Sequence, residues 1–151
     1  MSSRFDVNIQ VVPVAQYTGM GFYSFGQKRS LGVRGINKLV NIFAKWLLTP
    51  TGTDPINPSD GTQLANLIGS NVTLADAQEV LQISVSDTAE AIRNIQANRS
   101  DVPDDERLAS AEITAFILIE EGPGIAAQIH IRNVANQGLV LVLPTLSVVS
   151  P

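Results

Sequence analysis

The sequence predicts an α+β protein, with helices packed on a small, mainly antiparallel sheet made of an N-terminal strand plus a C-terminal three-strand meander. Three observations predict this fold class. Apolar residues alternate with polar ones near the N-terminus, follow helical spacing through the middle of the chain, and alternate again after residue 112. A chain of 151 residues fits one domain, 1–151, which is large enough to bury a core without disulfides.

The N-terminal strand is predicted over residues 5–11, where four apolar side chains alternate with polar ones: Phe5, Val7, Ile9 and Val11. Pro13 ends this strand or places it at a sheet edge. An arm rich in glycine and aromatic residues follows at about residues 15–32. Its members are Gly19, Gly21, Gly26, Gly32, Tyr17, Phe22, Tyr23 and Phe25. Polar residues interrupt the arm too often for a helix, and its aromatic side chains need burial.

Two helices and an intervening loop are expected in the middle of the chain. The first helix is predicted from five apolar residues at helical spacing: Ile36, Leu39, Val40, Phe43 and Leu47. Pro50 and Gly52 end it. Residues 49–61 contain three prolines and two glycines, so they form a loop. A short helix is expected over 62–68, ended by Gly69.

The long helix is the element that the pattern specifies best. Thr73 is an N-cap residue, and Asp76 reaches back to the cap and favours the helix dipole. An apolar stripe then runs for about six turns. It comprises Leu74, Ala77, Leu81, Val85, Thr88, Ile92 and Ile95.

Three antiparallel strands with two hairpin connections are predicted at the C-terminal end. On the first strand, one face is predicted to consist of Ile113, Ala115, Ile117 and Ile119. Phe116 and Leu118 lie on the other face. A turn at 121–124 leads to a second strand, whose apolar face is Ile125, Ala127, Ile129 and Ile131. A turn at 136–138 leads to the apolar run 139–143. Such a run must be central, covered, or offered to another chain by strand addition.

Charge is sparse and unevenly distributed. Only 16% of the residues are charged, against about 25% in typical domains, which suggests a surface partly occupied by partners. The net charge of −4 argues against nucleic-acid binding. Five of the ten basic residues fall between positions 28 and 45, and an acidic group follows later. The two sets are Lys28, Arg29, Arg34, Lys38, Lys45 and Asp101, Asp104, Asp105, Glu106. These patches can steer partners or copies of the same chain into register.

Several classes of protein are excluded or disfavoured by what the chain lacks. It has no cysteine, which excludes disulfides, thiolate nucleophiles and cysteine-ligated zinc. The first ten residues have no signal-peptide core, and no apolar run approaches the roughly 20 residues that span a bilayer. We therefore expect synthesis in the cytoplasm and no membrane partner.

No residue pattern points to catalysis, a cofactor or a metal, so we expect a non-enzymatic protein. The single histidine, His130, is predicted on a strand surface, with no nucleophile-elbow motif elsewhere. The carboxylates 104–106 lack the spacing and the central glycine of a calcium loop. The glycines at 19 and 21 lack the remainder of a dinucleotide fingerprint or a phosphate loop. Trp46 is expected either at the rim of the core or as an interface anchor.

Residues 39–68 resemble the sheath-initiator family of contractile phage tails, also called the baseplate wedge or baseplate protein W type. The residues that carry the likeness follow the first helix: Leu47-Leu48-Thr49-Pro50, Gly52, Pro55, Asn57, Pro58, Gly61 and Leu64 to Ile68. Thr53 and Asp54 stand where the family tends to have Glu and Arg. Glu106-Arg107-Leu108 represents the family's acid-proline-arginine motif without its proline. The family continues with a long helix and C-terminal strands, and this chain follows that order, so the likeness covers roughly two thirds of the chain.

The resemblance implies a structural virion protein of a tail baseplate that links the wedge to the first sheath ring and templates sheath assembly. Implied partners are the baseplate wedge proteins and the sheath protein, with multiple copies in a symmetric assembly inside the virion. The candidate interface residues are Glu106, Arg107, Trp46, Leu139, Leu141 and Leu143, with an internal ion pair as the other role for the first two. The alternatives are a tail-terminator or another tail connector, or a small soluble ligand-binding domain.

Overall fold

The computed structural model describes residues 6–7, 32–64, 72–119 and 124–147. These ranges form an α+β fold with two helices and a three-stranded antiparallel meander, as predicted. The elements are α1 (Gly35–Leu48), α3 (Leu74–Ala97), β3 (Leu108–Ile119), β4 (Gly124–Asn133) and β5 (Gly138–Ser147). The strand order is β3-β4-β5, and a separate short ribbon pairs β1 (Asp6–Val7) with β2 (Gly32–Val33). Most of the predicted N-terminal strand and of the 15–32 arm lies outside the described residues.

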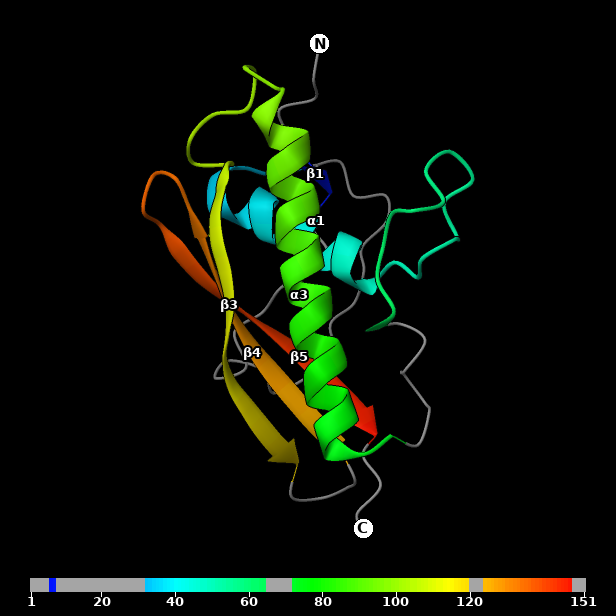
Figure 1. Ribbon diagram of the computed structural model, residues 1–151. Helices are drawn as coiled ribbons and strands as arrows, with labels where there is room; N and C mark the ends of the chain where they lie inside the picture. The colour runs from blue at the N-terminus through cyan, green and yellow to red at the C-terminus, as the bar shows by residue number, and fades with distance from the viewer. Residues whose placement is uncertain (1–5, 8–31, 65–71, 120–123, 148–151) are drawn as a thin grey trace.

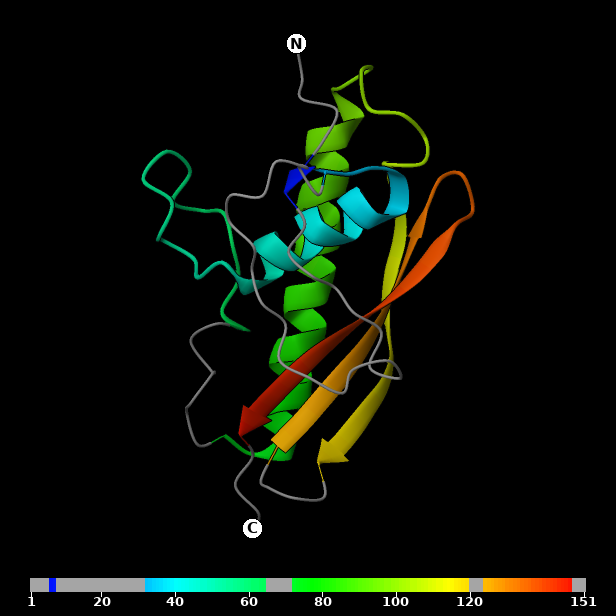
Figure 2. The same cartoon turned by 180° about the vertical axis from the view of Figure 1, so that it is seen from behind.

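Both helices lie on the same face of the three-stranded sheet (Figures 1 and 2). The long helix α3 packs on β3, and the shorter α1 crosses α3 and packs on β4 and β5. This arrangement gives two layers with one core between them. Neither α1 nor α3 combines the length and the apolar character that crossing a bilayer requires.

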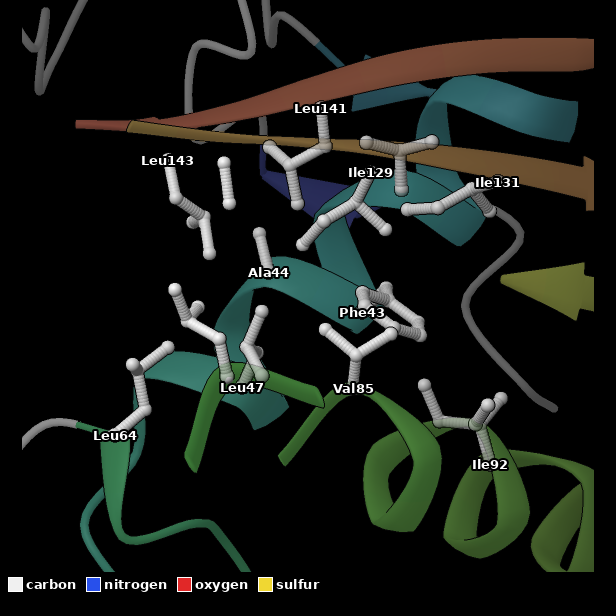
Figure 3. Packing of buried hydrophobic residues seen from close by; sticks show 14 of the residues in the cluster. Phe43, Ala44, Leu47, Leu64, Val85, Ile92, Ile129, Ile131, Leu141 and Leu143 are labelled. Atoms are coloured by element: carbon white, nitrogen blue, oxygen red, sulfur yellow. The ribbon is translucent and has the colours of Figure 1, made fainter. Parts of the chain in front are cut away.

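The core is filled by the inward face of the sheet and one stripe from each helix. Figure 3 shows Ile129, Ile131 and Leu141 pointing from the sheet toward Phe43 of α1 and Val85 of α3. Phe43 and both isoleucines have no exposed surface. Burying an aliphatic or aromatic side chain of this size contributes about 1.5–3 kcal/mol, so this cluster holds the two layers together.

Helix α1 follows its predicted register, while α3 departs from its prediction at both ends. The Thr73 hydroxyl accepts a hydrogen bond from the Asp76 N–H at 3.2 Å and donates to its carboxylate at 2.7 Å, which confirms the predicted cap. Leu74 and Ile95 are 37% and 46% exposed, so their assignment to the core stripe was wrong. The buried face advances in steps of four, from Thr88 to Ile92 to Gln96, and Ile95 falls one position off it.

The prediction that Ile113 shares one face of β3 with Ala115 and Ile117 was wrong, because the register of the strand shifts twice. The register shifts between Leu108 and Ser110 and again between Ile113 and Ala115. One extra residue moves all later side chains to the opposite face of the sheet. Ile113 and Phe116 therefore both pack against the core, although they were predicted on opposite faces. In β4, which is regular up to its own shift at 125–127, the predicted inward face is confirmed.

The predicted loop over residues 49–61 is confirmed and is closed at its base. The Thr62 N–H donates to the Thr49 carbonyl at 2.8 Å, the Thr51 N–H donates back to the Thr62 carbonyl at 3.2 Å, and the Thr62 hydroxyl donates to the Leu47 carbonyl at 2.6 Å. Gly61 has φ +100°, and a Cβ there would meet the Thr49 carbonyl oxygen. Figure 1 shows this loop projecting on the side away from the sheet. The predicted short helix lies, beyond Leu64, outside the described residues.

Gly61→Ala is expected to lower the free energy of unfolding by about 3 kcal/mol, because it adds backbone strain and a collision to the closed base of the loop. Gly52→Ala is the matched control, since Gly52 has φ +88° but open space around its Cβ position. It carries only the left-handed strain, about 1 kcal/mol. Urea titrations followed by circular dichroism measure both, and equal losses would contradict the tight closure at Gly61.

Candidate protein-interaction surfaces

Glu106 is buried where the start of α1 meets the segment that precedes β3. Its carboxylate forms an ion pair with the Lys38 ammonium group at 2.8 Å and accepts a hydrogen bond from the Gly35 N–H at 3.4 Å. The N-cap residue Arg34 makes no side-chain cap hydrogen bond. Glu106 therefore supplies the cap from 71 residues away, with its negative charge at the positive end of the helix dipole.

Gln96 and Arg107 join the end of α3 to the same segment. The Gln96 side-chain amide donates to the Glu106 carbonyl at 2.9 Å and accepts from the Leu108 N–H at 2.8 Å. The Arg107 guanidinium donates to three carbonyl oxygens, those of Gln96 at 3.3 Å, Arg99 at 3.1 Å and Val102 at 3.0 Å. Of these acceptors, the Gln96 carbonyl lies in the last turn of α3, whose carbonyls lack intrahelical partners, while Arg99 and Val102 belong to the segment that follows the helix.

The turn between β4 and β5 is the third element tied to this segment. Asn133 is 1% exposed and donates from Nδ2 to the Asp105 carbonyl at 2.7 Å. The Val134 N–H donates to the Arg107 carbonyl at 2.9 Å, and the Ala135 N–H donates to the Asp104 carbonyl at 3.3 Å. Residues 104–108, which we call the corner segment, thus connect α1, α3 and the β4–β5 turn.

Two of the predicted interface residues, Glu106 and Arg107, are therefore engaged within the chain. The structure pairs Glu106 with Lys38 rather than with Arg107. Asp101, from the same acidic group, pairs with Arg99 at 2.8 Å on the surface, and this contact lowers the pKa of the Asp101 carboxyl. No three His, Asp or Glu side chains in the described part of the chain come together in a way that could hold a metal ion.

Trp46 is half-buried and lines an open groove of about 530 Å³ between the 49–62 loop and α3. The groove combines apolar and acidic or polar side chains. Its lining includes both kinds of residue. The apolar ones are Trp46, Val80, Ile83 and Ala91, and the polar or acidic ones are Thr51, Ser59, Asp60 and Asp87. Both predicted roles of Trp46, core rim and interface anchor, fit this place.

The apolar run 139–143 lies in β5, which pairs with β4 and with no second strand among the described residues. Its leucines point inward: Leu141 is 4% and Leu143 8% exposed, and Leu139 packs against the core. The Asn133 N–H donates to the Gln137 carbonyl at the hairpin end. Alternation along an antiparallel ladder then points the N–H groups of Val140 and Val142 away from β4.

Other predicted features lie on the outer face of the sheet or outside the described ranges. His130 is in β4, as predicted, and a Cβ on Gly138 would meet its Nε2 atom, so the glycine leaves room for the ring. Within the basic stretch, Lys38 is held by Glu106, while Lys28 and Arg29 are not among the described residues. The glycine pair 19–21 is not among them either.

Gln96 and Asn133 are the structural residues that sequence reasoning missed. Gln96 continues the buried i, i+4 series of α3, so the helical period could have found it. Asn133 is the last residue of β4 and precedes a turn, where polar residues are ordinary, and nothing local marks it as 1% exposed.

Glu106→Ala is expected to lower the free energy of unfolding by about 3 kcal/mol, because Lys38 would keep a largely buried charge and α1 would lose its cap. The double variant Lys38→Met with Glu106→Leu should recover part of this loss, since it removes both charges. Asp101→Asn is the control from an exposed pair and should change stability little. Urea titrations measure all three variants. A loss in Asp101→Asn as large as in Glu106→Ala would contradict the special role of Glu106.

Comparison with known proteins identified no relative of this chain. No protein-family model matches the chain, and no curated protein matches it.

Proposed function

We propose that this chain is a structural subunit of a contractile tail baseplate, which links the wedge to the first sheath ring and templates sheath assembly by strand addition at β5. The observation that carries the proposal is the edge of β5, which pairs with β4 and with no second strand among the described residues. Its ladder with β4 is regular from Gly138 to Leu143. A regular edge offers alternating N–H and C=O groups to an incoming strand.

The burial of β5 suits it to act as a template. Leu141 and Leu143 anchor its inward face in the core, so the strand keeps its shape without an outer neighbour. Val140, on the outward face, is 41% exposed and can pack against an added strand. Unprotected edges of this kind invite pairing, and natural proteins blunt those that have no partner.

The opposite edge of the sheet is blunted. Strand β3 carries two bulges, and bulges interrupt the spacing that an added strand needs. On β5, the register shift comes only near Pro144, beyond the regular stretch. The two edges therefore differ in a way that favours β5 as the docking edge.

The family resemblance supplies the biological setting for this edge. The loop residues that carry the likeness, from Thr49 to Gly61, form the closed loop after α1. Glu106 and Arg107 lie in the corner segment, which ties the β4–β5 hairpin to both helices. We expect multiple copies of the chain in a symmetric baseplate, each offering one β5 edge to a sheath subunit.

Val142→Pro is expected to abolish seeding of purified sheath protein, because it removes an N–H that points to the free edge while leaving the ladder with β4 intact. Val142→Thr keeps the N–H and the branched side chain, so it should seed normally. Leu141→Pro is unsuitable, since Leu141 is in the core. Electron microscopy of sheath polymers measures seeding, with thermal melting as the folding check. A folded Val142→Pro variant that seeds normally would contradict strand addition.

Immunogold labelling of purified tail particles tests the assignment to the baseplate. Antibody against this chain should label the baseplate end of a contractile tail. Label at the head-proximal end would replace the proposal with the tail-terminator alternative. Protein that stays in the soluble fraction of a lysate, with particles unlabelled by antibodies to several epitopes, would refute a virion role.

A further inference from the structure

A second surface of this chain has the chemistry of a protein-docking site. Between Trp46 and Ile92 the sequence holds six carboxylates and no lysine, arginine or histidine. They are Asp54, Asp60, Asp76, Glu79, Asp87 and Glu90. This stretch spans the end of α1, the 49–62 loop and most of α3. The stretch therefore has a net negative charge, although Lys45, just before it, lines a neighbouring pocket together with Asp54 and Asp60. A partner with positive charge would be steered to it.

The groove beside Trp46 lies within this negative region. Two of the six carboxylates, Asp60 and Asp87, line it from opposite sides, one on the loop and one on α3. Trp46 and Ile83 contribute apolar surface to the same groove, and Ile83 is 52% exposed although it belongs to a packed helix. A partner that covers this apolar surface would remove it from water, which favours binding.

The loop wall of the groove is held in place by its own hydrogen bonds. The hydrogen bonds between Thr62 and Thr49 close its base. The Asp54 carboxylate accepts from the N–H groups of Ile56 at 2.8 Å and Asn57 at 3.3 Å, which shapes the tip. A preformed wall lowers the entropy cost of binding, because little has to be ordered when a partner arrives.

We propose that this groove binds a segment of a partner protein that carries both apolar and basic side chains. Apolar side chains of that segment cover Ile83 and the face of Trp46, while lysine or arginine side chains pair with Asp60 and Asp87. Tryptophan is a frequent anchor at interfaces, and a cation stacked on its ring gains further attraction. Charge complementarity favours this occupant, since the groove lining contains two carboxylates and no basic side chain, and an acidic segment would be repelled.

The proposal is independent of the role of β5, because it uses α1, the 49–62 loop and α3 alone. The chain supplies its own reporter: Trp46 is its single tryptophan. A short amphipathic peptide of leucine and lysine, titrated into the full chain at low salt, serves as the probe. We expect a saturable change in Trp46 fluorescence. The same peptide with glutamate for lysine, or with serine for leucine, should give none.

Matched variants locate the binding. Asp60→Asn with Asp87→Asn is expected to weaken binding about fivefold, as the loss of two solvent-exposed ion pairs implies. Glu79→Gln with Glu90→Gln removes the same charge from exposed sites of α3 that do not line the groove, and it should leave the affinity unchanged. Ile83→Ser is expected to weaken binding about tenfold through lost apolar contact. Circular dichroism checks that each variant is folded.

Three outcomes would overturn the proposal. Trp46 fluorescence that does not saturate with the leucine–lysine peptide would refute the site. Equal weakening by the two double variants would show attraction by net charge alone. A change in Trp46 fluorescence with protein concentration and no peptide, accompanied by dimers in sedimentation, would assign the groove to a second copy of the chain.

Discussion

The carboxylate of Glu106 is the constraint on which the rest of this fold depends. It is 6% exposed, pairs with Lys38 and accepts from the first N–H of α1, so removing it would leave both a charge and a helix end without partners. The residues on either side extend the same role. The Arg107 guanidinium donates to the Gln96 carbonyl at the end of α3, and the Asn133 side chain donates to the Asp105 carbonyl, which connects the β4–β5 turn to the corner segment. One short segment thereby orients two helices and a hairpin.

This organisation separates a rigid interior from surfaces open to partners. The corner segment holds one end of the two-layer core, and the apolar cluster of Figure 3 fills the space between the layers. Because the side chains of β5 alternate, the leucines that stabilise the strand and the valines on its outer face do not compete. The 49–62 loop also combines a fixed part with an open part. Hydrogen bonds close its base, while other residues of the loop line the groove beside Trp46. Each segment can therefore stabilise the fold and still present groups to a partner, because different atoms of the segment serve the two purposes.

Local periodicity predicted most elements of the fold, and its failures have specific physical causes. Helix α1 and the cap at Thr73 depend on near neighbours, so sequence spacing predicted both. The predicted grouping of β3 side chains into two faces was wrong because a bulge at Thr114 inserts one residue. A bulge is a property of the paired strands rather than of one strand. Ile95 was placed inside because it is apolar, although the helical phase reserves that face for Gln96.

The sequence by itself determined the fold class, the register of α1 and the N-terminal cap of α3, because each depends on residue type and short-range spacing. Only the tertiary structure decided which polar residues are structural. Lys38 and Glu106 are 68 residues apart along the chain, and nothing local marks them as a pair. The groove at Trp46 likewise needs the loop and α3 side by side. Long-range contacts of this kind follow from how packed elements meet, which no local pattern encodes.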